Sequence, residues 1–109
     1  MRSLIVLEKN NIYKLKVNWK LIEVKLPTRN PFVNHSILLS KQDKIFLDNE
    51  FIYIFTTINQ KRTFYKYSRR NNYLATEYRL NEISLKLREL KNSDDSEELT
   101  IEELQSLLK

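Results

Sequence analysis

The 109-residue chain contains no glycine and no cysteine, and it has only one histidine and two prolines. Without cysteine there is no disulfide, no thiol nucleophile and no thiolate metal ligand, and one histidine cannot supply a histidine-based metal site. Without glycine the chain lacks the phosphate-binding loop, the dinucleotide-binding fingerprint and the nucleophile elbow. We therefore expect no metal, no cofactor and no catalytic residues, and a protein that binds instead of an enzyme.

Long apolar runs are also missing. The longest, Phe51–Phe55, ends at Thr56, and the N-terminal Leu4–Leu7 is followed by the charged Glu8. A membrane span needs about 18 apolar residues, and a signal peptide needs a longer apolar core with a small-residue cleavage site. These patterns predict a soluble protein with a cytoplasmic location and no membrane partner.

Charged residues are frequent and are unevenly distributed along the chain. Residues 92–109 hold six acidic residues and one lysine, whereas residues 1–91 hold eighteen Lys and Arg and eight Asp and Glu. The division predicts a basic domain over 1–91 and an acidic tail over 92–109. Such an asymmetry indicates an anionic partner, a tail that masks the basic body, or both; a solvated surface is the alternative. Frequent Asn, Lys, Ile and Tyr are typical of an AT-rich genome, compatible with a phage or plasmid.

The first two thirds of the chain alternate with the period of a β-strand. Strands are expected over 3–8 and from Ile12 to Leu26, with a phase change at Leu21-Ile22 that predicts a bulge there or a turn near Asn18. After a loop over 27–34, a short strand at 36–40 and hairpins turning at Asp48-Asn49 and Asn59-Gln60 follow. The pattern predicts an antiparallel meander of about six to seven strands over residues 3–67, with asparagine replacing glycine in the turns.

After residue 70 the period becomes helical. A stripe at spacings of three and four predicts one long helix over about 73–91, capped by Asn71 or Asn72; the stripe comprises Tyr73, Thr76, Leu80, Ile83, Leu87 and Leu90. The segment Asn92–Ser96 ends it, and the capping-box pattern Thr100–Glu103 predicts a short helix at about 100–108. The fold class is therefore α+β, with the long helix packed on the sheet or, alternatively, forming a homodimer.

The strongest candidate site lies where strand gives way to predicted helix, because cations and aromatic rings alternate there. Phosphates attract cations, and unstacked bases stack on aromatic faces. The alternative is that the tyrosines belong to the core and the cations solvate an edge strand. Lys14, Lys16 and Lys20 could extend the same surface. The expected nucleic-acid-binding residues are Lys61, Arg62, Phe64, Tyr65, Lys66, Tyr67, Arg69, Arg70 and Tyr73.

The end of the chain suggests a second contact. Ile101, Leu104 and Leu108 form an apolar stripe beside Glu102 and Glu103, as in acidic amphipathic helices that enter a partner's groove. We expect these three apolar residues to bind a partner.

Two remaining features give weaker evidence of function. Glu23-Val24-Lys25 resembles part of a restriction-type nuclease site, which also needs an upstream acid, and only Glu8 is available. His35 lies in a predicted loop without an orienting partner. The sequence thus predicts a small, non-enzymatic basic protein that binds DNA or RNA; the alternatives are an adaptor or inhibitor of a larger host or virion complex and, distantly, a metal-dependent nuclease.

Overall fold

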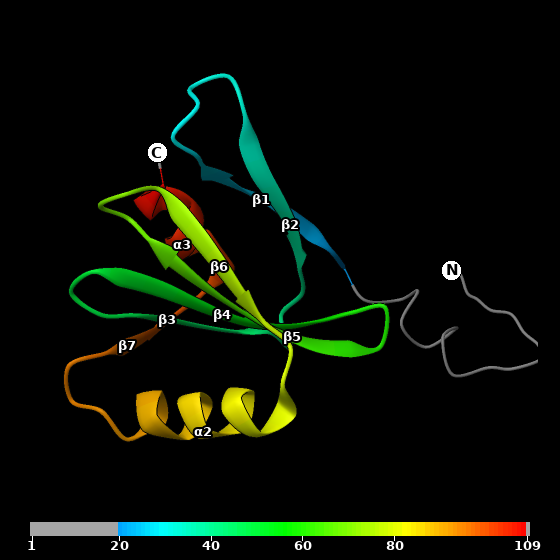
Figure 1. Cartoon of the computed structure of the whole chain (residues 1–109), viewed down its shortest axis with the longest axis vertical. Coiled ribbons are helices and arrows are strands. Elements are labelled where there is room, and N and C mark those ends of the chain that lie inside the picture. The colour runs from blue at the N-terminus through cyan, green and yellow to red at the C-terminus, as the bar shows by residue number, and fades with distance from the viewer. Residues whose placement is uncertain (1–19, 109) are drawn as a thin grey trace, which may run out of the picture.

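The computed structural model describes residues 20–108, and the strand expected at 3–8, most of the strand expected from Ile12, and Lys14 and Lys16 lie outside the described residues. It is α+β with antiparallel strands, as expected (Figure 1). The elements are β1 (Ile22–Pro27), β2 (Asn34–Leu39), β3 (Lys44–Leu47), β4 (Phe51–Ile58), β5 (Lys61–Ser68), β6 (Tyr73–Glu77), α2 (Leu80–Lys91), β7 (Glu97–Leu99) and α3 (Ile101–Leu107).

The strands form two sheets. β6, β5, β4, β3 and β7 make a five-stranded sheet in that order, and β1 and β2 form a separate hairpin. Both expected hairpins form. The turn at Asn59-Gln60 places Ile58 opposite Lys61 as expected. The other turn lies at Asn49-Glu50, one residue later than expected, because Leu47 is opposite Ile52 and the Asp48 N–H donates to the Phe51 carbonyl oxygen. β4 is the middle strand, which confirms the interpretation of its apolar run as a central strand. The predicted meander is therefore confirmed for β3 to β5, whereas β1 and β2 form a separate sheet.

The turns show how a chain without glycine reverses direction. Asn59, Gln60 and Asn72 have positive φ angles of 51°, 66° and 52°. A two-residue hairpin turn with both φ angles positive matches the twist of its strands, and asparagine tolerates this region better than most residues. Asparagine thus replaces glycine at two of these three positions.

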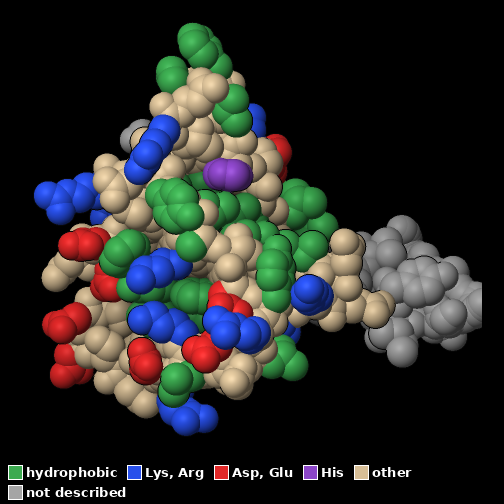
Figure 2. Space-filling view, in the orientation of Figure 1, with side chains coloured by type: hydrophobic (Ala, Val, Ile, Leu, Met, Phe, Trp, Pro, Cys, Tyr) green, Lys and Arg blue, Asp and Glu red, His purple; other side chains and the backbone are tan. Residues whose placement is uncertain are grey.

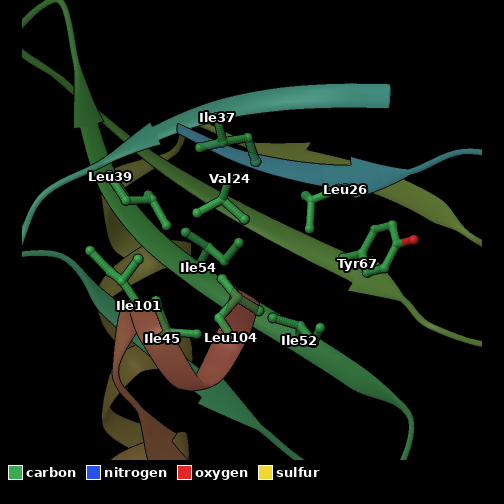
Figure 3. Close-up of a cluster of buried hydrophobic side chains, with 10 residues drawn as sticks. All are labelled: Val24, Leu26, Ile37, Leu39, Ile45, Ile52, Ile54, Tyr67, Ile101 and Leu104. Atoms are coloured by element: carbon green, nitrogen blue, oxygen red, sulfur yellow. The ribbon is translucent and has the colours of Figure 1, made fainter. Parts of the chain in front are cut away.

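One face of the sheet is covered by the β1–β2 hairpin and by α3. Figure 3 shows their side chains meeting those of β3, β4 and β5 in one cluster. The cluster is aliphatic apart from one tyrosine, and consists of Val24, Leu26, Ile37, Leu39, Ile45, Ile52, Ile54, Tyr67, Ile101 and Leu104. Three segments distant in sequence therefore share this core.

The opposite face is covered by α2 and is mainly aromatic. Its buried members are Phe46, Tyr53, Phe55, Phe64, Ile83 and Leu90. The rings of Phe55 and Phe64 stack with centroids 4.7 Å apart across the β4–β5 pair. Ile83 and Leu90 of the expected helical stripe pack on the sheet. Of the two expected roles of this stripe, core packing and homodimer formation, these two residues have the first.

The expected helix over 73–91 is wrong in its first third. Residues 73–77 form β6, paired with β5 so that Tyr73 lies opposite Ser68 and Glu77 opposite Phe64, and α2 has 12 residues. Tyr73 and Thr76 fit a helical stripe by spacing. The free edge of β5, however, offers backbone hydrogen-bonding partners to this segment, and such tertiary contacts override a local pattern. Asn71 and Asn72 lie in the β5–β6 turn and do not cap α2, whose N-cap is Arg79 without a side-chain capping bond.

The acidic tail is part of the fold. β7 pairs with β3, and α3 begins with the expected capping box, in which Thr100 and Glu103 each accept from the other's backbone N–H. Because α3 contributes Ile101 and Leu104 to the core, the division at residue 91 does not coincide with a structural boundary. Within residues 20–108, no helix is long and apolar enough to cross a membrane.

Candidate nucleic-acid interface

Strand β5 does not present its aromatic side chains as one surface. Phe64 is buried under α2 and Tyr67 is buried in the aliphatic cluster, while Tyr65 is half-buried. A ring enclosed by the core cannot stack on a base. The expected roles of Phe64 and Tyr67 in binding nucleic acid are therefore wrong, because alternation along β5 directs each to a covered face.

The cations of β5 are likewise separated. The Lys61 ammonium lies 4.3 Å from the centre of the Tyr78 ring, and that of Lys66 lies 4.2 Å from the centre of the Phe51 ring. Successive side chains of a strand point to opposite faces, and the even and odd positions of β5 indeed meet different neighbours. Arg62 is exposed beside the β4–β5 turn, at the opposite end of β5 from Arg69.

The β5–β6 turn keeps the rest of the predicted site together. Arg69 and Arg70 are exposed in this turn, and Tyr73, at the start of β6, is 60% exposed. The turn is held by hydrogen bonds to its backbone: the Ser68 hydroxyl accepts from the Asn71 N–H at 3.2 Å, and the Arg69 N–H donates to the Glu50 carbonyl oxygen at 3.3 Å. Its two guanidinium groups project from a fixed backbone.

The β1–β2 loop joins this turn from 42 residues away in the chain. Arg29 Nε donates a hydrogen bond of 3.3 Å to the carbonyl oxygen of Asn71. In Figure 1 the loop is at the top of the molecule and the turn is at its upper left. A third guanidinium group therefore reaches the turn that carries Arg69 and Arg70.

The loop also carries a fully accessible aromatic ring. Thr28 donates to Val33 O at 2.8 Å, and Asn30 Oδ1 accepts from the Phe32 N–H at 3.0 Å, so the loop is internally braced. Phe32 at its tip is 92% exposed, and Figure 2 shows hydrophobic side chains at that apex with Lys and Arg side chains below it. We call Arg29, Phe32, Arg69, Arg70 and Tyr73 the arginine surface.

The arginine surface is electrostatically uncompensated. Within residues 20–108 the side-chain ion pairs are Lys44–Glu98, Arg79–Glu77 and Lys86–Glu89, and none involves Arg29, Arg69 or Arg70. Arg79 differs from them, because its side-chain hydrogen bonds to Glu77 lower the pKa of that carboxyl to about 2. Three arginines thus remain available for an external anion.

The strand of the acidic tail, β7, lies away from this surface. The sheet order places β4 and β3 between β5 and β7, which separates β5 from β7 by about 14 Å at the usual strand spacing. Glu97 and Glu98 therefore lie at the opposite edge of the sheet from β6. The acidic side chains of β7 therefore do not reach the basic turn, whereas α3 packs beside β1, where the Gln105 side chain donates to the Glu23 carbonyl oxygen.

The expected partner-binding residues are core residues. Ile101 is 6% exposed and Leu104 is fully buried, while Leu108 is half-buried. Their apolar stripe packs on the sheet and on the β1–β2 hairpin. The stripe is amphipathic as predicted, but its partner is the chain's own core and no external groove is needed.

The nuclease-like residues gather no further ligands. Glu23 and Lys25 are exposed on β1, and residues 20–108 hold no group of three or more His, Cys, Asp or Glu that could bind a metal ion. His35 is exposed on β2, in register with Leu26.

No protein-family model, no curated protein and no solved structure matches the chain. The arginine surface offers planar hydrogen-bond donors for phosphate oxygens beside accessible aromatic faces. Sequence reasoning missed Arg29 and Phe32, because the segment with both prolines carried only a turn signal. Projecting loops frequently hold binding residues, and this was the signal that could have found them.

Proposed function

We propose that the protein binds single-stranded nucleic acid through the arginine surface. The hydrogen bond from Arg29 to Asn71 carries this proposal, because it brings the β1–β2 loop to the β5–β6 turn and so assembles three arginines without carboxylate partners among the described residues. Arginine binds phosphate oxygens through paired N–H groups. Neutralising phosphates releases counterions, which supplies most sequence-independent affinity.

The two exposed rings favour a single strand over a duplex. Phe32 on the β1–β2 loop and Tyr73 at the start of β6 have accessible faces, and only unpaired bases offer their own faces for stacking. Major-groove recognition by a helix needs one that projects from the protein, whereas α2 packs on the sheet and α3 packs in the core. The proposed ligand is therefore an unpaired stretch of DNA or RNA.

Fluorescence anisotropy with labelled single-stranded and duplex DNA and RNA tests the proposal. The variant carries Arg29→Ala, Arg69→Ala and Arg70→Ala; a control removes the same charge elsewhere through Lys41→Ala, Arg88→Ala and Lys91→Ala, all exposed. We expect the first variant to bind at least tenfold more weakly. Its slope of log Kd against log salt should fall by about 2, since each phosphate that is no longer neutralised lowers the slope by about 0.7. The control should stay close to wild type.

Equal weakening in the two variants would show that only net charge matters and would overturn the proposed surface. A wild-type protein that binds none of the four nucleic acids would overturn the function, and a protein adaptor or inhibitor would become the hypothesis to test.

The aromatic contribution has its own variant. Phe32→Ser should weaken binding by about fivefold or more, since stacking contributes about 1–3 kcal/mol for each base. Leu38→Ser on the exposed side of β2 is the matched control, because Leu38 is also a highly exposed apolar residue. Binding that weakens equally in both variants would contradict stacking on Phe32.

A further inference from the structure

The two edges of the five-stranded sheet differ in how they are protected. β7 is three residues long and carries Glu97 and Glu98, and short, charged edge strands resist pairing with other chains. β6 has five residues without lysine or proline, and its one carboxylate, on Glu77, is engaged by Arg79. Within residues 20–108 no strand pairs with the outer side of β6.

The register identifies the backbone groups on that outer side. A two-residue turn makes its flanking residues a hydrogen-bonded pair, so Ile58 and Lys61 bond to each other and the odd-numbered residues of β5 face β4. The even-numbered residues of β5 then bond to Tyr73, Ala75 and Glu77. The N–H and C=O groups of Leu74 and Thr76 consequently point away from the sheet.

Exposed apolar side chains accompany this edge. Tyr73, Tyr78 and Leu80 are all at least half exposed, and they lie on β6 or just beyond its end. Edge strands with accessible backbone groups and apolar neighbours pair readily with another strand.

We propose that β6 is a homodimer interface in which two copies pair antiparallel about Ala75 and join their sheets. In this register Leu74 bonds to the partner's Thr76 and Thr76 to the partner's Leu74, so both outward-facing residues are satisfied. Ala75 lies opposite the partner's Ala75 at a non-hydrogen-bonded position, where antiparallel strands approach most closely, to about 4.5 Å between Cα atoms. The smallest side chain of β6 thus occupies the position with the least room.

Charge favours a second copy of this chain as the occupant. No like charges oppose each other along β6 in this register, since Glu77 faces the partner's Tyr73. The turn carrying Arg69 and Arg70 comes beside the start of the partner's α2, whose first turn carries Glu82. Within residues 20–108, Glu82 has no ion pair of its own.

The surface beside β6 also fits the partner's aromatic ring. A hollow between β6 and α2 is lined by Phe64, Lys66, Ala75, Glu77 and Lys86. The partner's Tyr73 would be placed opposite Glu77, on this same face of the sheet, and its ring would cover the hollow, so that base stacking by Tyr73 belongs to the monomer and stacking by Phe32 is independent of the dimer.

A charge-swap experiment on the full chain, without nucleic acid, tests the dimer. Sedimentation equilibrium should give twice the 13.2 kDa monomer mass for wild type at high concentration. Ala75→Arg and Ala75→Glu each place like charges at the dyad, and each should weaken the dimer by at least about tenfold, because like charges brought together in an interface are strongly unfavourable. Mixing the two variants should restore a dimer. Circular dichroism establishes that both variants fold.

A matched variant separates this interface from one through the helix. Leu85→Lys on the exposed side of α2 should leave the dimer unchanged. Wild type that stays monomeric at every concentration would overturn the proposal, as would a dimer that tolerates Ala75→Arg. Amide exchange gives a further check: protection of Leu74 and Thr76 that persists in dilute monomer would assign the edge to another segment of the same chain and also overturn it.

Discussion

The Tyr67 hydroxyl donates a hydrogen bond of 2.6 Å to the backbone carbonyl oxygen of Pro27, 40 residues earlier in the chain. The same hydroxyl lies 3.1 Å from Oδ1 of Asn72. Tyr67 is 1% exposed, and burial raises the pKa of its hydroxyl, which therefore stays protonated and able to donate. A core residue thus joins the end of β1 to the turn that precedes β6, and holds together the two segments of the arginine surface.

Replacing Tyr67 by Phe should loosen this junction. The change leaves the ring in the core but removes the donor to the carbonyl of the half-buried Pro27, and it should lower the free energy of unfolding by about 1–3 kcal/mol. Urea denaturation measures the change. Tyr65→Phe is the control, since the Tyr65 hydroxyl makes no hydrogen bond within the described residues; equal destabilisation in both variants would show that the bond to Pro27 contributes nothing specific.

The end of the chain should be required for folding. Leu104→Ala removes a fully buried side chain and should cost about 2–5 kcal/mol of stability, as large-to-small core changes do. Leu85→Ala on the exposed side of α2 should change stability by no more than about 0.5 kcal/mol. Thermal unfolding followed by circular dichroism compares them.

Truncation after residue 91 gives a related expectation. The shortened chain lacks β7 and α3, and with them two core residues, Ile101 and Leu104. We expect it to unfold without cooperativity and not to bind nucleic acid more tightly. A truncated chain that unfolds cooperatively and binds nucleic acid more tightly would support the hypothesis that the tail masks the basic domain.

Introducing a glycine should stabilise the protein at one turn. Gln60 has a φ angle of 66°, a left-handed conformation that costs a non-glycine residue about 1–2 kcal/mol, while glycine loses more backbone entropy on folding, by about 0.5–1 kcal/mol. Gln60→Gly should therefore raise the free energy of unfolding by about 0.5 kcal/mol. Asn59→Gly should raise the free energy of unfolding by less, because asparagine already tolerates the left-handed backbone region. Urea titration of both variants checks the order, and the reverse order would contradict this account of the turn.

Acid stability should depend on Asp48. Burial alone would raise the pKa of this carboxyl, but hydrogen bonds from the Tyr53 hydroxyl and from the backbone N–H groups of Phe51 and Glu50 outweigh it, and the pKa lies below its ordinary value. A carboxyl with a lowered folded pKa stabilises the fold above its unfolded pKa of about 3.9, and this stability disappears as the pH falls through the folded value.

The corresponding variant is Asp48→Asn. The difference in Tm between wild type and Asp48→Asn should be constant above about pH 5 and should shrink below about pH 4. Asp94→Asn, in the exposed loop between α2 and β7, provides the comparison. A difference that stays constant down to the acid limit would show that the carboxylate charge of Asp48 is not what the fold uses.

Local patterns predicted the elements well where one pattern dominated. The hairpin at Asn59-Gln60, the central position of β4 and the capping box of Thr100 were predictable, because turn chemistry and alternation act within a few residues. The β3–β4 hairpin was predicted with its turn one residue too early, at Asp48-Asn49 instead of Asn49-Glu50. β6 was not predictable, since Tyr73–Glu77 fits both periods and only pairing with β5 decides between them.

The candidate site was predicted in part. Arg69, Arg70 and Tyr73 remain exposed as expected, but Phe64 and Tyr67 are buried. Alternation shows that successive residues of β5 point to opposite faces, yet it cannot show that both faces are covered. That depends on α2 and on the β1–β2 hairpin, which are distant in sequence.

The sequence by itself determined the α+β class, the antiparallel hairpins, the amphipathic stripes and the separation of charge, because each follows from side-chain chemistry over short distances. The tertiary structure alone decided which neighbours those surfaces met. It buried the stripe of α3 in the core, placed β7 with Glu97 and Glu98 at the opposite sheet edge from β6, and brought Arg29 beside the β5–β6 turn. The physical reason is that burial and strand order arise from contacts between segments far apart in the chain, and no local pattern encodes them.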